Sequence, residues 1–503
     1  MSFLSVDVGS SRCKAALFNE NGVMLALRSA THAPRHPQPG HAELDPDLFL
    51  RVVAELACEL TALPECGPVQ AVCLSSHGET LIPAGADDRP LCPAILNTDT
   101  RAAEEAAWCE QQLGRERLFS ITGHISHPMY PLARMVWLRR HAPDIFRACR
   151  HFFGVTDYLL LRLGLPPLLD YSHASRFMAF DVHRLAWSEE VLALAEVTPQ
   201  ALSPAVPAGT VAGRLGNDAA ALLGVPPGTP VIVGGHDQVI GAVGLGVVTA
   251  GRAAGSLGTY ECLLVASTQP QLNRTALETS LNSYPHAVPG LWANIAYFPS
   301  GIMLDWLHGI LFGGEAGACE ETLWQSLEAA APAAPTGLLV TPHLIGTCNP
   351  EFNAHARAAV AGIGPDTSRA SLYKGVLEGI AAELSSITGY LESAGCGFND
   401  VYVAGGGTHS ALGMRLRAAL TGKSLHIMEC QESVCLGGAM LSSVALGIDA
   451  DLISAAQHMV REQQRIVPDA ALARQYAPQL AAWRRFRSLI VPKQIHSTEG
   501  EPS

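Results

Sequence analysis

Residues 231–246 read VIVGGHDQVIGAVGLG, and this stretch indicates the class of fold. Its three β-branched residues, Val231–Val233, predict a short buried strand. Gly234 and Gly235 are expected to break that strand and to let a backbone or a ligand approach closely. Asp237 then precedes a segment spaced by glycine and alanine, which predicts a tightly packed helix. Proteins with an open α/β fold carry their ligand-binding and catalytic residues between such a strand and helix. On spacing alone, Asp237 could equally be only the N-cap of that helix.

Composition narrows the class of protein. A chain of 503 residues favours two or more domains, and 48% hydrophobic with 16% charged residues describes a globular protein with a large core. The net charge of −13, without clusters of Lys and Arg, argues against a nucleic acid or an acidic membrane as partner. The 13 scattered cysteines lack a CxxC pair, which predicts reduced thiols. We find no leader pattern and no apolar run of roughly 18 residues, so we expect a soluble, cytoplasmic protein.

The N-terminus predicts a phosphate-binding turn. Three short apolar runs, the last two joined by Asn-Gly, predict an antiparallel meander; they are Phe3–Asp7, Lys14–Phe18 and Val23–Leu27. The first turn, Asp7–Ser11, offers backbone N–H groups and the hydroxyls of Ser10 and Ser11 to phosphate oxygens. Asp7 could face a magnesium ion, and Lys14 could point at the same anion. The alternative is an Asx-type turn without a ligand.

A second hairpin of the same shape follows about 250 residues later. Residues 256–267, SLGTYECLLVAS, predict a strand, a turn and a strand with Gly258 and Thr259 at the tip. Two such hairpins predict two related halves that face one cleft. We expect Glu261 to be a surface residue of this hairpin, and residues 202–230, rich in Pro and Gly, to be a surface connection.

Polar residues after a third predicted strand could line a pocket for hydroxyl groups. The strand Val69–Ser75 ends at His77, Gly78 and Glu79, and residues 95–101 bring Asp99 to the start of a helix. These polar groups could equally be loop caps.

Three consecutive glycines mark another strand-to-helix turn. Residues 366–395 predict a long helix, and Val401–Ala404 predicts a buried strand that runs into Gly405–Gly407. Bare backbone there could accept a flat ring or a phosphate, although a tight packing turn is as good an interpretation. Gly422-Lys423-Ser424 resembles the end of a P-loop, but Arg417 stands where that motif requires glycine.

Taken in order, these segments resemble the FGGY family of carbohydrate kinases, in the superfamily of actin, hexokinase and the heat-shock chaperone ATPases. The resemblance runs from about Leu4 to about Leu480. Seven motifs carry it: Asp7-x-Gly9-Ser10-Ser11, Asp99-x-Arg101, Gly234-Gly235-x-Asp237-Gln238, Ser256-x-Gly258-Thr259, Arg369 with Leu377-Glu378-Gly379, Gly405-Gly406-Gly407-x-x-Ser410, and Leu436-Gly437-Gly438-Ala439.

The resemblance implies an α/β fold of two actin- and hexokinase-like (ribonuclease H-like) domains with a cleft between them. Residues 1–248 would form the N-terminal domain, with the sugar side and the base. Residues 249–490 would form the nucleotide side, and 491–503 a disordered tail.

The resemblance also implies roles for individual residues. Asp237 would be the general base and Asp7 the metal ligand; the nucleotide would lie against Ser10, Ser11, Lys14, Gly258, Thr259, Gly405, Gly406, Gly407 and Ser410; the substrate would lie against His77, Gly78, Glu79, Asp99, Tyr130, Asp237 and Gln238.

The implied activity is phosphorylation of a small sugar or polyol with ATP and Mg²⁺, and a ketopentose such as xylulose is the first expectation. The alternative is a catalytically silent sugar- or nucleotide-binding sensor on the same fold. Sugar and ATP are the expected partners, and a homodimer is left open. The chain departs from the family's usual residues at Gly78, His236, Gly413, Arg415 and Ala419, which leaves the substrate uncertain.

Overall fold

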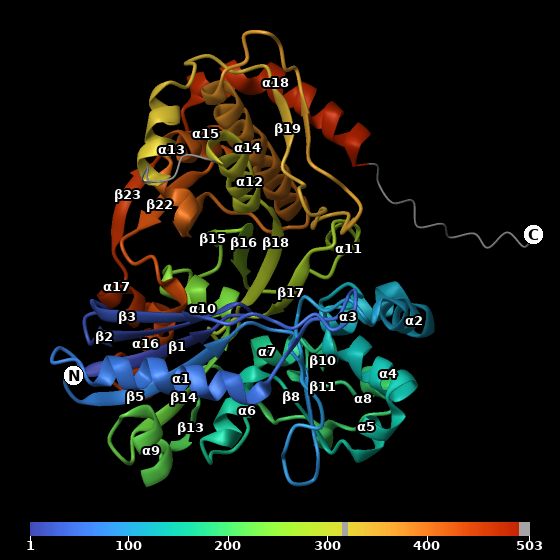
Figure 1. The fold of residues 1–503 in the computed structure, drawn as a ribbon, viewed down its shortest axis with the longest axis vertical. Coiled ribbons are helices and arrows are strands. Elements are labelled where there is room, and N and C mark those ends of the chain that lie inside the picture. The colour runs from blue at the N-terminus through green and yellow to red at the C-terminus, as the bar shows by residue number, and fades with distance from the viewer. Residues whose placement is uncertain (314–319, 492–503) are drawn as a thin grey trace, which may run out of the picture.

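The computed structural model describes residues 1–313 and 320–491, which form two stacked lobes (Figure 1). Residues 492–503 of the predicted tail lie outside the described residues. Each lobe is built on one large mixed sheet. The N-terminal lobe, at the bottom of Figure 1, contains a six-stranded sheet, and the C-terminal lobe contains a seven-stranded one.

The N-terminal sheet has the order β13-β14-β5-β1-β2-β3. Its strands are β1 (Ser2–Val8), β2 (Arg12–Asn19), β3 (Met24–Thr31), β5 (Val69–Ser76), β13 (Val211–Arg214) and β14 (Pro230–His236). The antiparallel meander β1-β2-β3 confirms the prediction from the apolar runs. β5 lies parallel to both β1 and β14, and the register aligns Val8 with Ser76 and Ser76 with His236. The carboxyl ends of three strands therefore meet at one edge, which we call the carboxyl edge.

Two expectations for this lobe are wrong. β14 is not broken by its glycines but continues to His236, with a register shift between Val233 and His236. Gly234 is required there because a Cβ atom would lie 2.3 Å from Ser75 Oγ on the neighbouring strand. Residues 202–230 are not only a connection. They contain β13, which pairs antiparallel with β14, and the helix α9 (Asn217–Leu223), because short regular elements fit between the turns that Pro and Gly mark.

The C-terminal sheet repeats this plan, with the order β17-β18-β16-β15-β21-β22-β23. Its strands are β15 (Arg252–Leu257), β16 (Tyr260–Ser267), β17 (Asn282–Pro285), β18 (Trp292–Pro299), β21 (Asp400–Ala404), β22 (Ser424–Met428) and β23 (Glu462–Ile466). As predicted, β15 and β16 form a hairpin with Gly258 and Thr259 at its tip. β21 and β22 lie parallel to β15, as β5 and β14 lie parallel to β1. The shared topology supports the prediction of two related halves.

Helices cover both sheets. They are α1 (Pro46–Thr61), α2 (Ala103–Leu113), α3 (Arg115–Thr122), α4 (Pro131–His141), α5 (Pro143–Ala148), α6 (Val155–Arg162), α7 (Tyr171–Ser175), α8 (Glu189–Leu192), α10 (Asp237–Gly244), α11 (Arg274–Glu278), α12 (Gly301–Phe312), α13 (Glu320–Ala329), α14 (Arg369–Ser393), α15 (Ala411–Thr421), α16 (Ser433–Ala445), α17 (Leu452–Met459) and α18 (Ala470–Ile490). Short strands complete the fold: β4 (Glu43–Leu44), β6 (Ile82–Ala84), β7 (Ala94–Ile95), β8 (His151–Phe153), β9 (Leu169–Asp170), β10 (Phe180–Asp181), β11 (Ala186–Trp187), β12 (Ala205–Val206), β19 (Leu339–Thr341) and β20 (Ala359–Ala361). α14 confirms the long helix predicted over 366–395.

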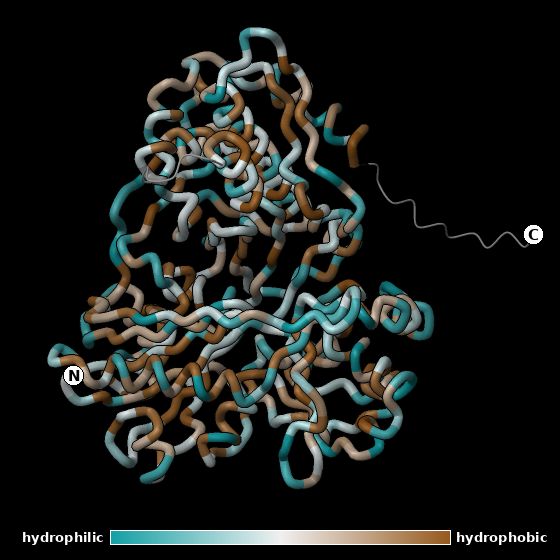
Figure 2. Tube along the Cα trace, viewed as in Figure 1, coloured by the Kyte–Doolittle hydropathy of each residue, from teal (hydrophilic) through white to brown (hydrophobic). Residues whose placement is uncertain are grey.

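The lobes share a buried core at their junction. It joins side chains of the N-terminal sheet, such as Phe3, with side chains of the C-terminal sheet, such as Leu264, around the helices α10 and α16. Hydrophobic segments accordingly run through both lobes and between them (Figure 2). α16 also packs on β1, because Gly438 leaves room for Ser5. The junction is therefore a continuous core.

The helices α10 and α16 cross backbone to backbone. A Cβ atom at Gly244 would lie 1.8 Å from the carbonyl oxygen of Ser433, and one at Gly437 would lie 2.1 Å from the carbonyl oxygen of Ile240. Only glycine permits this approach. The glycine spacing that marked the central stretch of sequence thus determines how the two lobes pack.

We predict that Gly244→Ala lowers the free energy of unfolding by about 1–3 kcal/mol, because the added methyl group forces the two helices apart. Urea denaturation followed by circular dichroism measures the change. The matched control is Gly389→Ala in α14, where a Cβ atom meets nothing within 4 Å. That variant should be neutral or more stable by up to about 1 kcal/mol. Equal stabilities for the two variants would contradict the close crossing.

Candidate active site

Two carboxylates meet at the carboxyl edge of the N-terminal sheet. Asp7 lies near the end of β1, and Asp237 is the first residue of α10, directly after β14. Asp237 Oδ1 accepts a hydrogen bond from the backbone N–H of Gln238 at 2.6 Å, but the N-cap position is held by His236 and no side chain caps the helix. The side chain of Asp237 is 23% exposed. The alternative that Asp237 is only the N-cap of its helix is therefore wrong, and its role as general base stays a prediction.

The environment of these carboxylates disfavours their charged forms. Burial, and then the charge of Asp237, raise the pKa of Asp7 to about 8. Burial, and then the charge of Glu79, raise the pKa of Asp237 to about 6. Asp7 Oδ1 is buried without a hydrogen-bond partner. An unpartnered carboxylate oxygen beside a second carboxylate is the kind of ligand that a hard cation prefers. The residues present thus fit a magnesium ion, with Asp7 as its protein ligand.

Lys14 faces the same region but is already paired. It is aligned with Asp7 in the β1–β2 ladder, and its Nζ lies 2.6 Å from Glu432 Oε2 in the loop before α16. This ion pair links the two lobes. Ser10 and Ser11 form the turn between β1 and β2, where Ser11 is exposed and Ser10 half-buried. The predicted phosphate-side residues of the N-terminal lobe therefore lie together at the junction.

A buried arginine that no sequence motif indicated lies beside two residues that are predicted to bind the substrate, Glu79 and Tyr130. Arg176, directly after α7, forms an ion pair with Glu79, and the side chains are 6% and 4% exposed. Its guanidinium carbon lies 5.1 Å from the ring centre of Tyr130 and 5.3 Å from that of Tyr284. Tyr284 comes from β17 of the C-terminal lobe. Tertiary packing alone brings these residues together, because they are separated by 46 to 205 positions in the chain.

Glycine at position 78 is explained by that arginine. A Cβ atom at Gly78 would lie 3.0 Å from Arg176 Cγ and 3.0 Å from His236 Cδ2. The departure from the usual family residue thus makes room for two other side chains. Tyr130 is buried nearby and donates its hydroxyl hydrogen to Asn282 Oδ1 at 3.0 Å.

His77 and Asp99 are bonded to the protein itself. The ring nitrogens of His77 lie 2.8 Å from Val8 O and 2.6 Å from Thr80 Oγ1. Asp99 accepts hydrogen bonds from Arg101 and from the backbone N–H of Ala42. Both residues hold loops beside the site. Their expected contact with a substrate stays a prediction.

The nucleotide-side glycines lie where β15 and β21 end. Gly405 and Gly407 approach the end of β15, and Cβ atoms there would lie 2.6 Å from Leu257 O and 2.9 Å from Leu257 Cβ. These two glycines are therefore required for packing. Gly406 is different, because a Cβ atom there meets nothing within 4 Å. It leaves bare backbone next to open space.

Two residues cap the helix that follows. Ser410 Oγ accepts a hydrogen bond from Gly413 N at 3.0 Å and donates one to Glu328 Oε2 at 2.9 Å. Glu328 Oε1 also accepts one from Leu412 N at 2.6 Å. Ser410 is thus the N-cap of α15, and its expected contact with the nucleotide stays a prediction.

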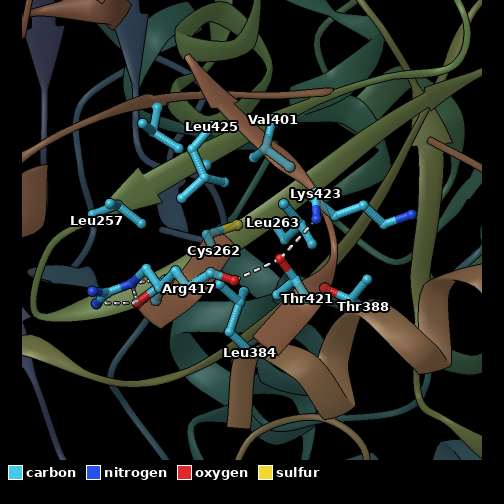
Figure 3. Close-up of a pocket in the computed structure, with 13 residues that line it drawn as sticks. Leu257, Cys262, Leu263, Leu384, Thr388, Val401, Arg417, Thr421, Lys423 and Leu425 are labelled. Carbon is cyan, nitrogen blue, oxygen red and sulfur yellow. Dashed lines mark hydrogen bonds and ion pairs between the residues drawn. The ribbon is translucent and has the colours of Figure 1, made fainter. Parts of the chain in front are cut away.

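Glu261 is not the surface residue that the hairpin pattern predicted. It is 1% exposed and forms an ion pair with Arg417 of α15 at 2.9 Å, and Ser300 Oγ donates to it at 3.1 Å. The pair borders a cavity of about 10 Å³. Thr421 and Lys423 also line that cavity (Figure 3). Glu261 is buried because α15 covers its face of the hairpin. The pair ties the hairpin that carries Gly258 and Thr259 to the helix after the triple glycine.

A groove of about 1160 Å³ lies between the lobes, with His127 and Arg115 on one wall and Phe352 and Arg274 on the other. Across residues 1–313 and 320–491, we find no group of three or more His, Cys, Asp or Glu that could hold a metal ion. Within the same ranges, no helix is both long and apolar enough to cross a membrane.

Comparison with known proteins covers most of the chain. The model of the FGGY family of carbohydrate kinases, N-terminal domain, matches residues 2–244, and that of the C-terminal domain matches residues 253–446. A xylulose kinase of Escherichia coli is 28% identical over 97% of this chain and 99% of its own length. A gluconokinase of Bacillus licheniformis is 26% identical over 94% of this chain and 93% of its own.

The fold is shared with solved structures. A gluconate kinase of Lactobacillus acidophilus superposes with a TM-score of 0.89 at 23% identity, over 97% of this chain and 98% of that one. This likeness confirms the predicted α/β fold of two actin- and hexokinase-like domains.

We predict that Glu261→Gln lowers the free energy of unfolding by about 3–5 kcal/mol, because it leaves the guanidinium of Arg417 buried without a counter-charge. Urea denaturation measures the change. The double variant Glu261→Leu with Arg417→Met should recover most of the loss, since it removes both charges. As a control, Glu278→Gln breaks an exposed pair with Arg274 and should change stability by less than about 1 kcal/mol. A double variant no more stable than Glu261→Gln would contradict this account.

Proposed function

Because the chain belongs to the FGGY family of carbohydrate kinases, we propose that it transfers the γ-phosphate of ATP to a hydroxyl group of a small sugar, with Asp237 as the general base. The chain is an enzyme, a carbohydrate kinase that uses ATP. One observation carries the role of Asp237: it is a partly exposed carboxylate at the carboxyl edge, beside a second carboxylate with an unpartnered oxygen. A sensor, the alternative function, would not need that arrangement.

Proton transfer by Asp237 accounts for one half of the reaction. A pKa of about 6 leaves the carboxylate ionised near neutral pH and still close to the range in which a general base works well. Hydrogen bonding at Oδ1 fixes the side chain in one orientation. A substrate hydroxyl held against the carboxylate would lose its proton as the phosphorus–oxygen bond forms. Asp237 would then carry that proton.

The other half of the reaction needs the phosphate charges to be neutralised. Asp7 would hold Mg²⁺, which usually keeps several waters and binds one or two carboxylates together with substrate phosphates. The bound ion would offset the charge of the β- and γ-phosphates. Lys14, Ser10 and Ser11 on one lobe and Gly258 and Thr259 on the other lie on either side of the junction. We place the phosphates between them, and the rest of the nucleotide against Gly406 and its neighbours.

Charge favours a neutral sugar over a sugar acid. Arg176 is paired with Glu79, Arg101 with Asp99 and Glu43, and Lys14 with Glu432. Arg134 donates to the carbonyl oxygens of Ile95 and Asp99. Each of these cations is thus engaged, and Asp7 and Asp237 are carboxylates without a paired cation among them. A ketopentose such as xylulose is therefore a better candidate than gluconate.

Other proposed roles rest on position. We assign Glu79, Tyr130 and Gln238 to the hydroxyl groups of the sugar, and Gly78 to the close packing beside them. We divide the chain at residues 248 and 249, which separates α10 from β15. A homodimer and a cytoplasmic location stay predictions.

We predict that Asp237→Asn lowers kcat by about 10²–10⁴-fold while ATP binding is nearly unchanged, because the amide keeps the shape of the side chain but cannot take a proton. A coupled assay of ADP release measures kcat, and titration calorimetry measures nucleotide affinity. The control is Asp218→Asn on the exposed face of α9, which should behave as the unmodified enzyme. A turnover close to that of the control would remove Asp237 from the role of base.

The charge argument predicts that kcat/KM for xylulose exceeds kcat/KM for gluconate by at least about tenfold, since the carboxylate of gluconate would face Asp237 while each of the cations named above is already engaged. ADP release with each sugar at a fixed ATP concentration gives both values. Asp237→Asn assayed beside them shows that the activity belongs to this enzyme. A preference for gluconate would overturn the assignment to neutral sugars.

A further inference from the structure

Ser300 lies at the turn between β18 and α12, and this turn is bonded to the hairpin that carries Gly258 and Thr259. Ser300 N donates to Thr259 O at 3.1 Å, and Gly301 N donates to Gly258 O at 3.1 Å. A Cβ atom at Gly301 would lie 2.5 Å from Gly258 O, so only glycine permits this approach. The start of α12 is therefore bonded directly to the tip of the hairpin.

The side chain of Ser300 does not cap its own helix. A serine at the N-cap position usually accepts a hydrogen bond from a backbone N–H of the first turn. Ser300 is the N-cap of α12, but its side chain makes no such bond. Its hydroxyl instead donates to Glu261 Oε2 at 3.1 Å. The direction is fixed, because an ionised carboxylate only accepts hydrogen bonds. The hydroxyl therefore binds the hairpin and leaves α12 without a side-chain cap.

Glu261 follows Thr259 by two residues on the same hairpin and is itself held by α15. Arg417 donates from Nε to Glu261 Oε1 at 3.0 Å and from Nη2 to Oε2 at 2.9 Å. Ser300, Glu261 and Arg417 are between 1% and 3% exposed. Two parallel bonds from one guanidinium fix the plane of a carboxylate. The oxygen that accepts from Ser300 is therefore held in one position.

These bonds join both of the turns to which we assign the nucleotide. α15 is the helix after the triple glycine, and Gly405 and Gly407 pack against Leu257, the last residue of β15, as described above. Arg417 and Leu257 line the same small cavity (Figure 3). The hairpin is thus held on both sides of its tip, by the triple glycine at Leu257 and by α15 at Glu261.

The contact with α12 sets the direction of the peptide unit at the tip. The carbonyl oxygen and the next N–H of a trans peptide point to opposite sides of the chain. Across residues 1–313 and 320–491 only the bond between Asn349 and Pro350 is cis. Because Gly258 O accepts from the start of α12, the N–H of Thr259 points away from that helix. Backbone N–H groups of such turns bind phosphate oxygens.

We propose that Ser300 is a positioning residue for the nucleotide: with Glu261 and Arg417, its hydroxyl holds the tip of the hairpin in the orientation that binds the phosphates of ATP. This inference rests on the proposed placement of the phosphates at Gly258 and Thr259. A buried ion pair adds little stability over an apolar pair of similar volume, because desolvation offsets the attraction. An apolar pair, however, would not supply an acceptor for the Ser300 hydroxyl.

Ser300→Ala tests the proposal, because it removes the hydroxyl and keeps both backbone bonds to the hairpin. We expect the Kd of ATP to rise about 3–10-fold, the usual worth of one hydrogen bond, while the Kd of adenosine changes less than twofold. Titration calorimetry measures both. The control is Ser442→Ala in α16, which removes another buried hydroxyl, bonded to Gly438 O at 2.9 Å, and should change neither value. An unchanged Kd of ATP, or an equal loss for adenosine, would overturn the proposal.

A second background shows whether Ser300 acts through the carboxylate. Glu261→Leu with Arg417→Met replaces the ion pair by apolar side chains, and we expect its stability to recover as stated above. The acceptor of the Ser300 hydroxyl is then gone, so the Kd of ATP should still rise about 3–10-fold. Adding Ser300→Ala to that background should cost less than about twofold more. Two multiplying losses would mean that Ser300 acts through another group and would overturn the proposal.

Thr259→Ala measured in parallel separates this inference from the proposed function. If neither Thr259→Ala nor Ser300→Ala weakens the binding of ATP, the phosphates do not lie at the hairpin and both ideas are wrong. If Thr259→Ala weakens it and Ser300→Ala does not, the positioning role alone is wrong.

Discussion

Placing two carboxylates at one edge of a sheet is the constraint on which the rest of this site depends. Parallel strands bring their carboxyl ends together, so Asp7 near the end of β1 and Asp237 after β14 share a poorly hydrated region where their charges repel. Such an arrangement is costly unless cations and hydrogen-bond donors face it. The protein supplies the Gln238 N–H to Asp237 and leaves one oxygen of Asp7 unpartnered. A magnesium ion with bound phosphates would provide the partner that this oxygen lacks.

Glycines permit the close approaches that this edge requires, and each acts at a different contact. Gly234 lets β14 lie against Ser75, Gly78 admits the side chains of Arg176 and His236, and Gly244 lets α10 cross α16. Among the three consecutive glycines, Gly405 and Gly407 serve packing, whereas Gly406 faces open space. The packing interpretation of that motif is thus confirmed for Gly405 and Gly407, and the ligand interpretation stays a prediction for Gly406. A glycine motif indicates that two segments of the chain approach closely. It does not by itself indicate a bound ligand.

A structural feature could be predicted from the sequence when the pattern that indicates it lies within a few neighbouring residues. The meander, the hairpin with Gly258 and Thr259, and the strand before Asp237 were predictable because turn residues and β-branched runs act over a few positions. The burial of Glu261 was not, because its partner Arg417 lies 156 residues away. Arg176 and Tyr284 gave no signal for the same reason. No periodicity marks a side chain whose neighbours come from another element or another lobe.

The division into a sugar lobe and a nucleotide lobe is therefore incomplete as a description of the site. β17 belongs to the C-terminal sheet, yet its Asn282 and Tyr284 contact Tyr130 and His236 of the N-terminal lobe. Glu432, ahead of α16, pairs with Lys14 on β2. Each lobe thus supplies groups that order the other lobe's half of the site. Since phosphoryl transfer requires both substrates to be aligned at once, shared side chains at the junction make the order of one half depend on the presence of the other.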